Sequence, residues 1–345
     1  MNNMKWYNIH DDNSPIISCR VRLARNLKKY PFFAKLDKSQ ATEMINEISK
    51  TIVRENGFYF SHIGQKSDIE KLSLLEHHKI SLDLLRGDNP RGLISSVDDT
   101  IHIMLNEEDH IRIQSIRPGK NVRNAFALAN DTDNLIEEYF EYAFDEKYGY
   151  LTSCPSNVGT GMRASYMVHL PMLEVTGKLP RIINSLSSVG MTIRGLYGES
   201  SDPIGSIYQI SNQVTLGKPE EEIISNLENI TNQIVQNEME TFQSKIKKHK
   251  VFFEDQVYRA YGILTNCRQI DLKEARKHLS TMRLGRSVGL LENELPNISI
   301  YAIMMNIEYG NLKINTNSDF LDSEIDIVRA SYIRKVLINP HNKGE

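Results

Sequence analysis

The segment from residue 100 to residue 116 alternates between apolar and polar side chains, with one break in its middle. Ile101, Ile103 and Leu105 recur at every second position before the break, and Ile111 and Ile113 do so after it. A period of two is typical of β-strands that bury one face. The break, residues 106–109, is polar and acidic, so the sequence predicts a β-hairpin with an acidic tip.

The spacing of apolar residues changes along the chain and divides it into two parts. Residues 16–217 mix short alternating segments with helical ones, without repeats. A long helix is predicted after Pro219, since apolar residues then recur at helical spacing and the lysines of residues 245–250 suit its negative C-terminal end. Later signals are helical, including an Asp271 cap and an amphipathic stretch at 323–337. We expect an α+β fold, with an antiparallel sheet flanked by helices in residues 1–250 and a helical C-terminal domain in residues 251–345.

The composition of the 345-residue chain argues against several classes of function. A formal net charge of -3 provides no overall attraction to nucleic acid or to an anionic membrane surface. No apolar run has the length of a signal peptide or a membrane span. The three cysteines are far apart and odd in number, which favours neither a disulfide framework nor a metal site. We therefore expect a cytoplasmic protein that binds neither nucleic acid nor membrane.

Two arginines lie at alternate positions near the start of the chain. On a strand, Arg20 and Arg22 would project from one face while Val21 and Leu23 face the core. Two fixed cations on one face suit a phosphate ligand. A solvated basic edge strand explains the same pattern, because edge strands commonly carry charge.

The segment from Cys154 to Ser165 contains two glycines, Gly159 and Gly161, followed by Arg163. Glycines allow backbone N–H groups to approach an anion closely. The segment superficially matches a dinucleotide-binding fingerprint, but that motif requires a helix to begin at the glycines, whereas residues 163–169 alternate like a strand. A phosphate site in this chain would therefore be built from arginines.

Carboxylates gather at the predicted hairpin tip, which reads Asn-Glu-Glu-Asp-His over residues 106–110. An acidic turn is commonly just a solvated turn. A functional interpretation gains support from Glu199, which follows Arg194 on a glycine-flanked loop. Two carboxylates can hold one guanidinium group.

These segments together resemble the ATP:guanido phosphotransferases, the family that includes creatine kinase and arginine kinase. The resemblance rests on four blocks in the family's order, at residues 18–22, 106–112, 154–165 and 194–212. It implies that the chain uses ATP and Mg²⁺ and transfers the γ-phosphoryl group to a guanidinium group.

The same resemblance assigns roles to individual residues by their positions in these blocks. It implies that Glu108 is the base, that Glu199 is the second guanidinium-binding carboxylate and that Cys154 is the reactive cysteine beside the substrate. A buried structural thiol explains Cys154 equally well from its chemistry alone. The residues expected to bind the nucleotide are Arg20, Arg22, Arg112, Arg163 and Arg194, with His78 on the adenine side through a looser match.

Within the family, the chain is most similar to the bacterial protein-arginine kinases of the McsB type. It reaches Arg20 too early to accommodate the N-terminal substrate domain of the metabolite kinases, and it has an additional helical C-terminal region. The resemblance implies protein substrates that present arginine, an activator protein, a Clp-type protease chaperone as partner and a dimer surface in the C-terminal domain. A kinase of free arginine and a non-catalytic phosphoarginine or protease adaptor are the alternatives.

One departure from this branch concerns its C-terminal phosphoarginine motif, Arg-Asp-x-x-Arg-Ala. The corresponding residues here are 325–330, where Ile325 replaces the first arginine and Arg329 is the second. The sequence therefore predicts weak phosphoarginine binding there. Alternatively, Ile325 simply packs in the apolar stripe of its helix.

Overall fold

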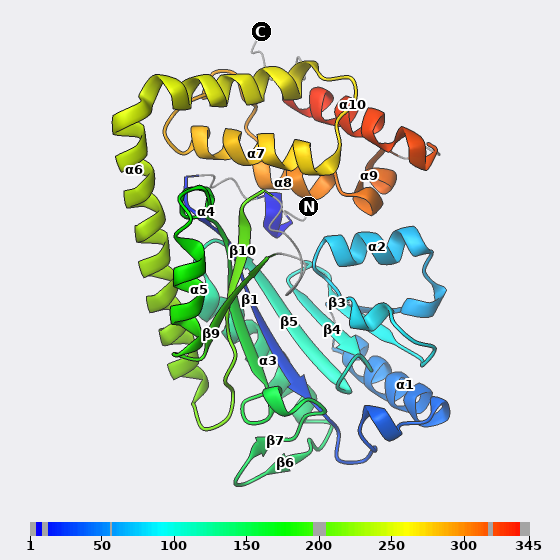
Figure 1. Ribbon diagram of the computed structural model, residues 1–345. Coiled ribbons are helices and arrows are strands. Elements are labelled where there is room, and N and C mark those ends of the chain that lie inside the picture. The colour runs from blue at the N-terminus through cyan, green and yellow to red at the C-terminus, as the bar shows by residue number, and fades with distance from the viewer. Residues whose placement is uncertain (1–4, 9–12, 56, 196–204, 317–319, 339–345) are drawn as a thin grey trace.

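The computed structural model describes residues 5–8, 13–55, 57–195, 205–316 and 320–338. It contains an eight-stranded sheet with the order β2-β3-β4-β5-β1-β8-β10-β9, in which all neighbouring strands are antiparallel. This sheet and the helices around it confirm the predicted α+β class (Figure 1). The strands are β1 (Ile16–Arg25), β2 (Phe58–His62), β3 (Gly92–Ser96), β4 (Ile101–Leu105), β5 (Ile111–Pro118), β8 (Met162–His169), β9 (Met191–Gly195) and β10 (Ile207–Asn212). A separate two-stranded sheet joins β6 (Phe144–Asp145) to β7 (Gly149–Tyr150).

The predicted hairpin of residues 100–116 is the pair β4 and β5, in which Ile103 lies opposite Ile113. The first strand, β1, lies between β5 and β8 near the middle of the sheet. The interpretation of Arg20 and Arg22 as a basic edge strand is therefore wrong. Val21 and Leu23 are buried as expected.

One face of the sheet packs on a large apolar core. This core joins the strands to helices α1 (Lys38–Arg54), α3 (Val122–Glu137), α5 (Leu179–Ser187) and the first half of α6 (Glu220–Asn266). On the opposite face, α2 (Asp68–Glu76) packs over β3 and β4 through Leu93 and Met104. The face that carries Arg20 and Arg22 therefore runs between α2 and the helices at the C-terminal end of the chain.

The C-terminal part of the chain is helical, as predicted, and packs against the same face of the sheet. It comprises the end of α6, α7 (Leu272–Arg286), α8 (Ile300–Asn306), α9 (Tyr309–Thr316) and α10 (Ile325–Ile338). A second core joins these helices to Ile116 and Ile207 of the sheet and to the short N-terminal 3-10 helix, Trp6–Asn8. The strands of the large sheet and the C-terminal helices thus share apolar packing.

Helix α6 consists of two helical segments that meet at a kink. His249 has non-helical backbone angles (φ -137°, ψ 42°), so the first segment ends among the lysines of residues 245–250, as the sequence predicted, and the second continues to Asn266. In Figure 1 it rises along one side of the sheet and then turns over the C-terminal helices. The division into domains near residue 250 stays a prediction. None of the described helices is both long and apolar enough to cross a membrane.

Candidate active site

Strand register places the five predicted nucleotide-binding arginines on one face of the sheet. Directly opposed residues of antiparallel strands project to the same side. Arg22 of β1 lies opposite Arg163 of β8, and Arg112 of β5 lies opposite Ala24, two positions further along the Arg20–Arg22 face. Arg194 of β9 lies opposite Gln209, which continues the same face through β10. Four strands therefore contribute cations to one surface.

Mutual repulsion shows how closely several of these cations lie. Burial, followed by the charges of Arg163 and Arg112, lowers the pKa of Arg20 to about 10. The pKa of Arg22 is also lowered, by burial and by Arg20, Arg112 and Arg163. Such an excess of positive charge is costly without an anion, so the surface is suited to a polyanion such as a triphosphate.

Strand β10 holds two of the arginines in position. Arg20 Nη2 donates a hydrogen bond to Gln209 Oε1 (2.7 Å), and Arg163 Nη2 donates to Ser211 Oγ (3.1 Å). Gln209 and Ser211 are two residues apart, so both project from the face that carries the arginines. Neither residue was identified from the sequence, although their alternate positions on a predicted strand were a usable signal.

The acidic hairpin tip contains three carboxylates in different environments. The side chains of Glu107 and Asp109 are buried, whereas that of Glu108 is 37% exposed. Glu107 receives two hydrogen bonds from Arg112 Nη1 and one from Ser81. The tip is therefore not a solvated turn, and Glu108 alone presents its carboxylate to the surface beside the arginines.

Glu108 lies beside one of the arginines and has a perturbed pKa. Its carboxylate lies 3.5 Å from Arg112 Nη2. Burial raises its pKa, with contributions from Asp109 and Glu107, against lowering by Arg112 and by a hydrogen bond from Cys154. A base with a raised pKa accepts a proton more readily near neutral pH. The hydrogen bond also brings Cys154 next to Glu108, so these two predicted residues lie together.

A buried polar clamp holds the segment of Cys154 against the hairpin. Asp109 Oδ1 accepts hydrogen bonds from Asn26 Nδ2 (2.7 Å) and from the backbone N–H of Ser153 (2.6 Å). Asn26 Oδ1 accepts from the N–H of His110 (3.0 Å). Asn26 follows β1 directly, so one network joins this strand, the hairpin tip and the residue before Cys154. The sequence analysis did not identify the clamp, whose members are far apart along the chain.

The two glycines after Cys154 have a structural role that differs from the prediction. Gly159 (φ +111°) and Gly161 (φ +63°) both adopt conformations that other residues rarely reach. A Cβ on Gly159 would approach Thr215 O to 2.4 Å, and one on Gly161 would approach Ala24 O to 2.6 Å. The N–H of Gly159 donates to Tyr150 O (3.3 Å). These glycines therefore permit close backbone packing, and Gly159 does not offer its amide to an anion.

His78 lies at the other end of the arginine surface. Burial, with the charges of Arg20 and Arg276, lowers the pKa of His78 to about 3, so its ring is neutral. Its Nε2 is buried and has no hydrogen-bond partner among the described residues. Trp6 packs against it, with ring centroids 6.2 Å apart. A neutral imidazole with a free nitrogen can hydrogen-bond a nucleobase.

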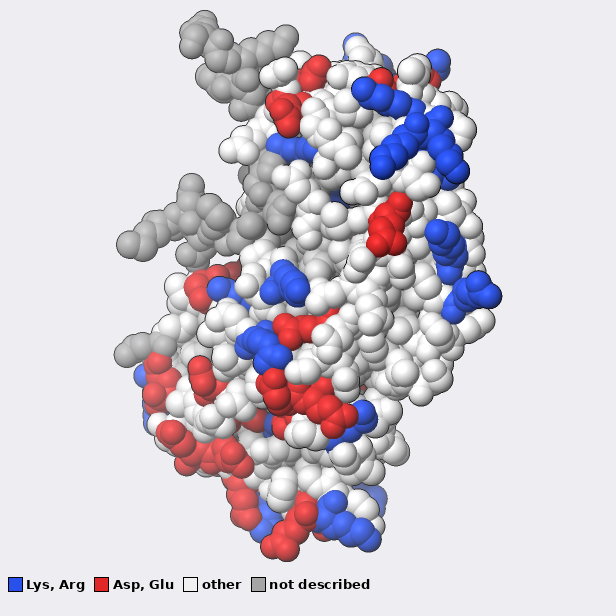
Figure 2. Space-filling view, turned by 90° about the vertical axis from the view of Figure 1, so that its left-hand side faces the viewer, with Lys and Arg blue, Asp and Glu red and all other residues white. Residues whose placement is uncertain are grey.

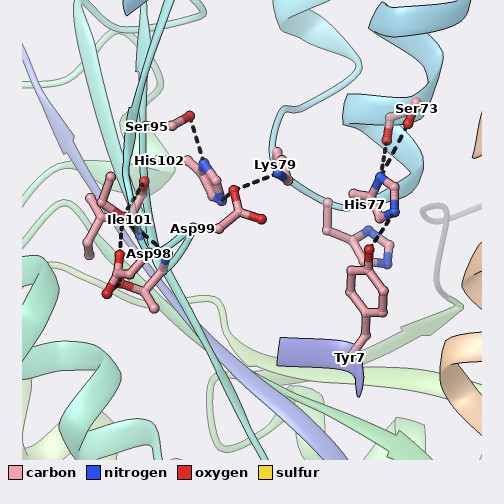
Figure 3. Close-up of polar contacts among 12 residues, drawn as sticks. Tyr7, Ser73, His77, Lys79, Ser95, Asp98, Asp99, Ile101 and His102 are labelled. Carbon is pink, nitrogen blue, oxygen red and sulfur yellow. Dashed lines mark hydrogen bonds and ion pairs between the residues drawn. The ribbon is translucent and has the colours of Figure 1, made fainter. Parts of the chain in front are cut away.

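Neighbouring residues fix the segment that carries His78, as Figure 3 shows. Tyr7 Oη lies 2.9 Å from His77 Nε2, whose ring also bonds to Ser73 of α2. On the other side, Lys79 pairs with Asp99 (2.5 Å). The described structure thus brings together Arg20, Arg22, Arg112, Arg163, Glu108, Cys154 and His78 along one face, with Arg194 on β9. Glu199 lies outside the described residues.

Comparisons with known proteins agree with this geometry. Residues 40–241 match the family described as ATP:guanido phosphotransferase, C-terminal catalytic domain, and residues 250–345 match the protein-arginine kinase McsB C-terminal domain. The protein-arginine kinase of Clostridium acetobutylicum is 41% identical over 330 residues, which cover 94% of this chain and 97% of the relative. That of Geobacillus sp. is 41% identical over 332 residues, or 94% and 91%.

Solved structures support the same fold. A lombricine kinase superposes with a TM-score of 0.59 at 25% identity and covers 68% of each chain. The duplicated taurocyamine kinase of Schistosoma mansoni, with bound transition state analog components, gives a TM-score of 0.60 at 24% identity over 70% of this chain and 36% of that one.

The sheet, its arginine surface and the acidic tip define a guanidino-phosphotransferase catalytic unit. The chain belongs to the ATP:guanido phosphotransferase family, and its near full-length relatives place it in the protein-arginine kinase branch of that family.

Proposed function

We propose that this chain transfers the γ-phosphoryl group of ATP to arginine side chains of proteins. One observation carries the proposal. A half-exposed carboxylate, Glu108, stands beside a surface of arginines contributed by several strands of one sheet. This arrangement can hold a triphosphate and a guanidinium group next to each other. The relatives of the chain are named protein-arginine kinases, which supports the same proposal.

Glu108 acts as the base in this proposal. A guanidinium group stays protonated in water because its pKa exceeds about 12. One guanidinium nitrogen attacks the γ-phosphorus, a nitrogen–phosphorus bond forms, and the bond between phosphorus and the β–γ bridging oxygen breaks to release ADP. The nitrogen's proton passes to Glu108, whose raised pKa suits the transfer.

The arginines neutralise the negative charge of the phosphates, including the charge that shifts between phosphate oxygens during the transfer. Loss of one such donor typically costs about 3 to 4 kcal/mol of barrier. Among the described residues, no group of three His, Cys, Asp or Glu side chains could hold a metal ion. Mg²⁺ keeps much of its hydration, so it would be held mainly by phosphate oxygens and water, with the arginines around them, and would supply further charge neutralisation.

Cys154 and Glu199 complete the acceptor side of the proposal. The thiol of Cys154 hydrogen-bonds to the base and to Ser156 Oγ (3.1 Å), so it lies where the guanidinium group would bind. Glu199 would supply the second carboxylate to the planar guanidinium group.

Proteins are favoured over free arginine as acceptors, because two relatives with this name match almost the whole chain, C-terminal region included. A purely non-catalytic adaptor is disfavoured, because it would not need a base beside the arginine surface. An activator, a Clp-type chaperone and a dimer through the C-terminal domain stay predictions from the resemblance, and a cytoplasmic location stays a prediction from the composition.

The test compares casein and free arginine as acceptors with Mg-ATP. We expect acid-labile phosphate on arginine residues of casein, detected by mass spectrometry, and much slower phosphorylation of free arginine. Glu108→Gln should keep nucleotide binding and lose phosphoryl transfer by a factor of about 10² to 10⁴. Transfer to free arginine alone, or turnover near the wild-type rate in Glu108→Gln, would contradict the proposal.

A further inference from the structure

A cavity of about 840 Å³ lies away from the arginine surface, where α4 (Pro171–Val175), the kink of α6 and α7 meet. None of the nucleotide-binding arginines lines it. Its volume is within the range of small-molecule sites, about 300 to 1,000 Å³. The proposed phosphoryl transfer leaves this cavity without a role.

Apolar side chains form most of the cavity wall. They come from both sides of the kink, including Phe242, Ile246, Phe252 and Phe253, and from α4. Phe252 is 64% exposed and Val175 is 68% exposed. Large apolar side chains that remain exposed around a concave surface mark a binding site, because a ligand that covers them removes apolar area from water.

The charge around these apolar residues is predominantly positive. Lys245 comes from α6, Lys273 and Lys277 come from α7, and Glu174 is the single acidic residue among the described residues that line the cavity. None of the three lysines forms an ion pair with a described residue. Figure 2 views this side of the molecule: basic side chains predominate over its upper, C-terminal part, and acidic ones gather below. The cavity therefore attracts anions.

The kink of α6 brings apolar and basic side chains together at the cavity. No proline or glycine causes the kink, since the sequence around it is Lys248-His249-Lys250. Lys245 and His249 are one helical turn apart, so both face the cavity together with Ile246 and Phe253. Lys247 and Lys248 project elsewhere. The non-helical backbone of His249 thus turns apolar and basic side chains of two helical segments toward one space.

We propose that this cavity binds a small organic anion whose aliphatic or aromatic body contacts the phenylalanines while its carboxylate or phosphate group pairs with Lys245, Lys273 and Lys277. The apolar wall excludes a purely inorganic anion as the preferred ligand, and the lysines disfavour a cationic amphiphile. Among the described residues, no exposed strand edge lines the cavity, so these residues offer an extended peptide no strand to pair with.

The first test measures ligand charge and the apolar contact. Calorimetry on the full chain should detect 1:1 binding of decanoate below its aggregation concentration, and at least about tenfold weaker binding of decyltrimethylammonium, which has a tail of similar length and the opposite charge. Phe252→Ala should weaken decanoate binding about tenfold. Val251→Ala is the matched control, because Val251 is adjacent, 78% exposed and not part of the lining.

The second test measures how much the lysines of the cavity contribute to the affinity for decanoate. The double variant Lys273→Glu/Lys277→Glu should lose at least about tenfold in decanoate affinity, whereas Lys247→Glu/Lys248→Glu should stay within about twofold of the wild type. Unchanged melting temperatures would show that all variants fold. Equal binding of the two amphiphiles, equal effects of the two lysine pairs, or no decanoate binding would each overturn the proposal, the last directing attention to an apolar protein partner.

Discussion

Two consecutive glutamates at the hairpin tip have opposite surroundings, and this difference determines the expected pH dependence. As the proposed base, Glu108 must be ionised to accept a proton, and its pKa is raised above the ordinary value for glutamate. The transfer rate should therefore fall as the pH decreases through that raised pKa, and recover above it. A pH–rate profile of kcat/KM should show this acid limb at a higher pH than an unperturbed glutamate would give. The residual activity of Glu108→Gln should show no such acid limb. If the variant keeps an acid limb at the same pH, the titrating group is not Glu108.

Glu107 supports the site through its pairing rather than through proton transfer. Its buried carboxylate binds Arg112, whose side chain is 13% exposed. Glu107→Gln removes the closer, buried one of the two carboxylates beside Arg112 and should lower the free energy of unfolding by about 3 kcal/mol. Urea denaturation measures this loss. Glu141→Gln is the control, because the pair of Glu141 with Lys28 is exposed and should contribute little. Equal stability of Glu107→Gln and the wild type would contradict the assigned role.

Trp6 provides an internal probe of nucleotide binding. It is the single tryptophan of the chain, and it packs against His78 and Tyr301 near Arg20. A base bound beside His78 should alter the environment of its indole ring. ATP titration should therefore change the tryptophan fluorescence, with a saturable curve that is absent in Trp6→Phe. Constant fluorescence at ATP concentrations that saturate turnover would place the base elsewhere.

At the scale of helices and strands, the sequence correctly predicted the features that depend on the spacing of nearby residues. The β4–β5 hairpin, strand β8 with Arg163 and the Asp271 cap of α7 all follow from spacing within a few residues. The central position of β1 did not follow, because alternation reports which face is buried and not which strands lie alongside. The clamp from Asn26 to Asp109 and Ser153 also required tertiary structure, since its partners lie up to 127 residues apart (153 minus 26).

Helix α10 gives a prediction about phosphoarginine. The side chain of Arg329 is buried, and it donates to Ile307 O (3.2 Å) and Ile270 O (3.1 Å) and pairs with Asp326. These contacts leave little of its guanidinium group for a ligand, and Ile325 offers no charge. Calorimetry with a phosphoarginine peptide should therefore show weak binding, and Ile325→Arg should strengthen it, since charged hydrogen bonds contribute about 1.5 to 3 kcal/mol each. Tight binding by a Glu108→Gln protein that persists in Arg329→Ala would contradict this prediction.

At the scale of the whole molecule, the catalytic strands and the C-terminal helices depend on each other. Ile116 and Ile207 of the sheet, with Trp6, are buried in the same core as α7, α8 and α10. The full chain should therefore unfold in one cooperative transition, and a fragment of residues 1–250 should be markedly less stable because this apolar surface becomes exposed. Calorimetric scans of both proteins measure this coupling. A fragment that melts at the temperature of the full chain would show that the two parts are independent.

The position of β1 has a consequence for synthesis on the ribosome. This strand is the first to emerge, yet both of its neighbours, β5 and β8, are translated about 90 to 150 residues later. At typical elongation rates of about 5 to 20 residues per second, the backbone N–H and C=O groups of this strand lack their sheet partners for several seconds or longer. During that interval, a segment with Val21, Leu23 and two arginines of the later active site remains unpaired on the nascent chain. The positive charges of these two arginines also make the unpaired strand less prone to pair with another chain.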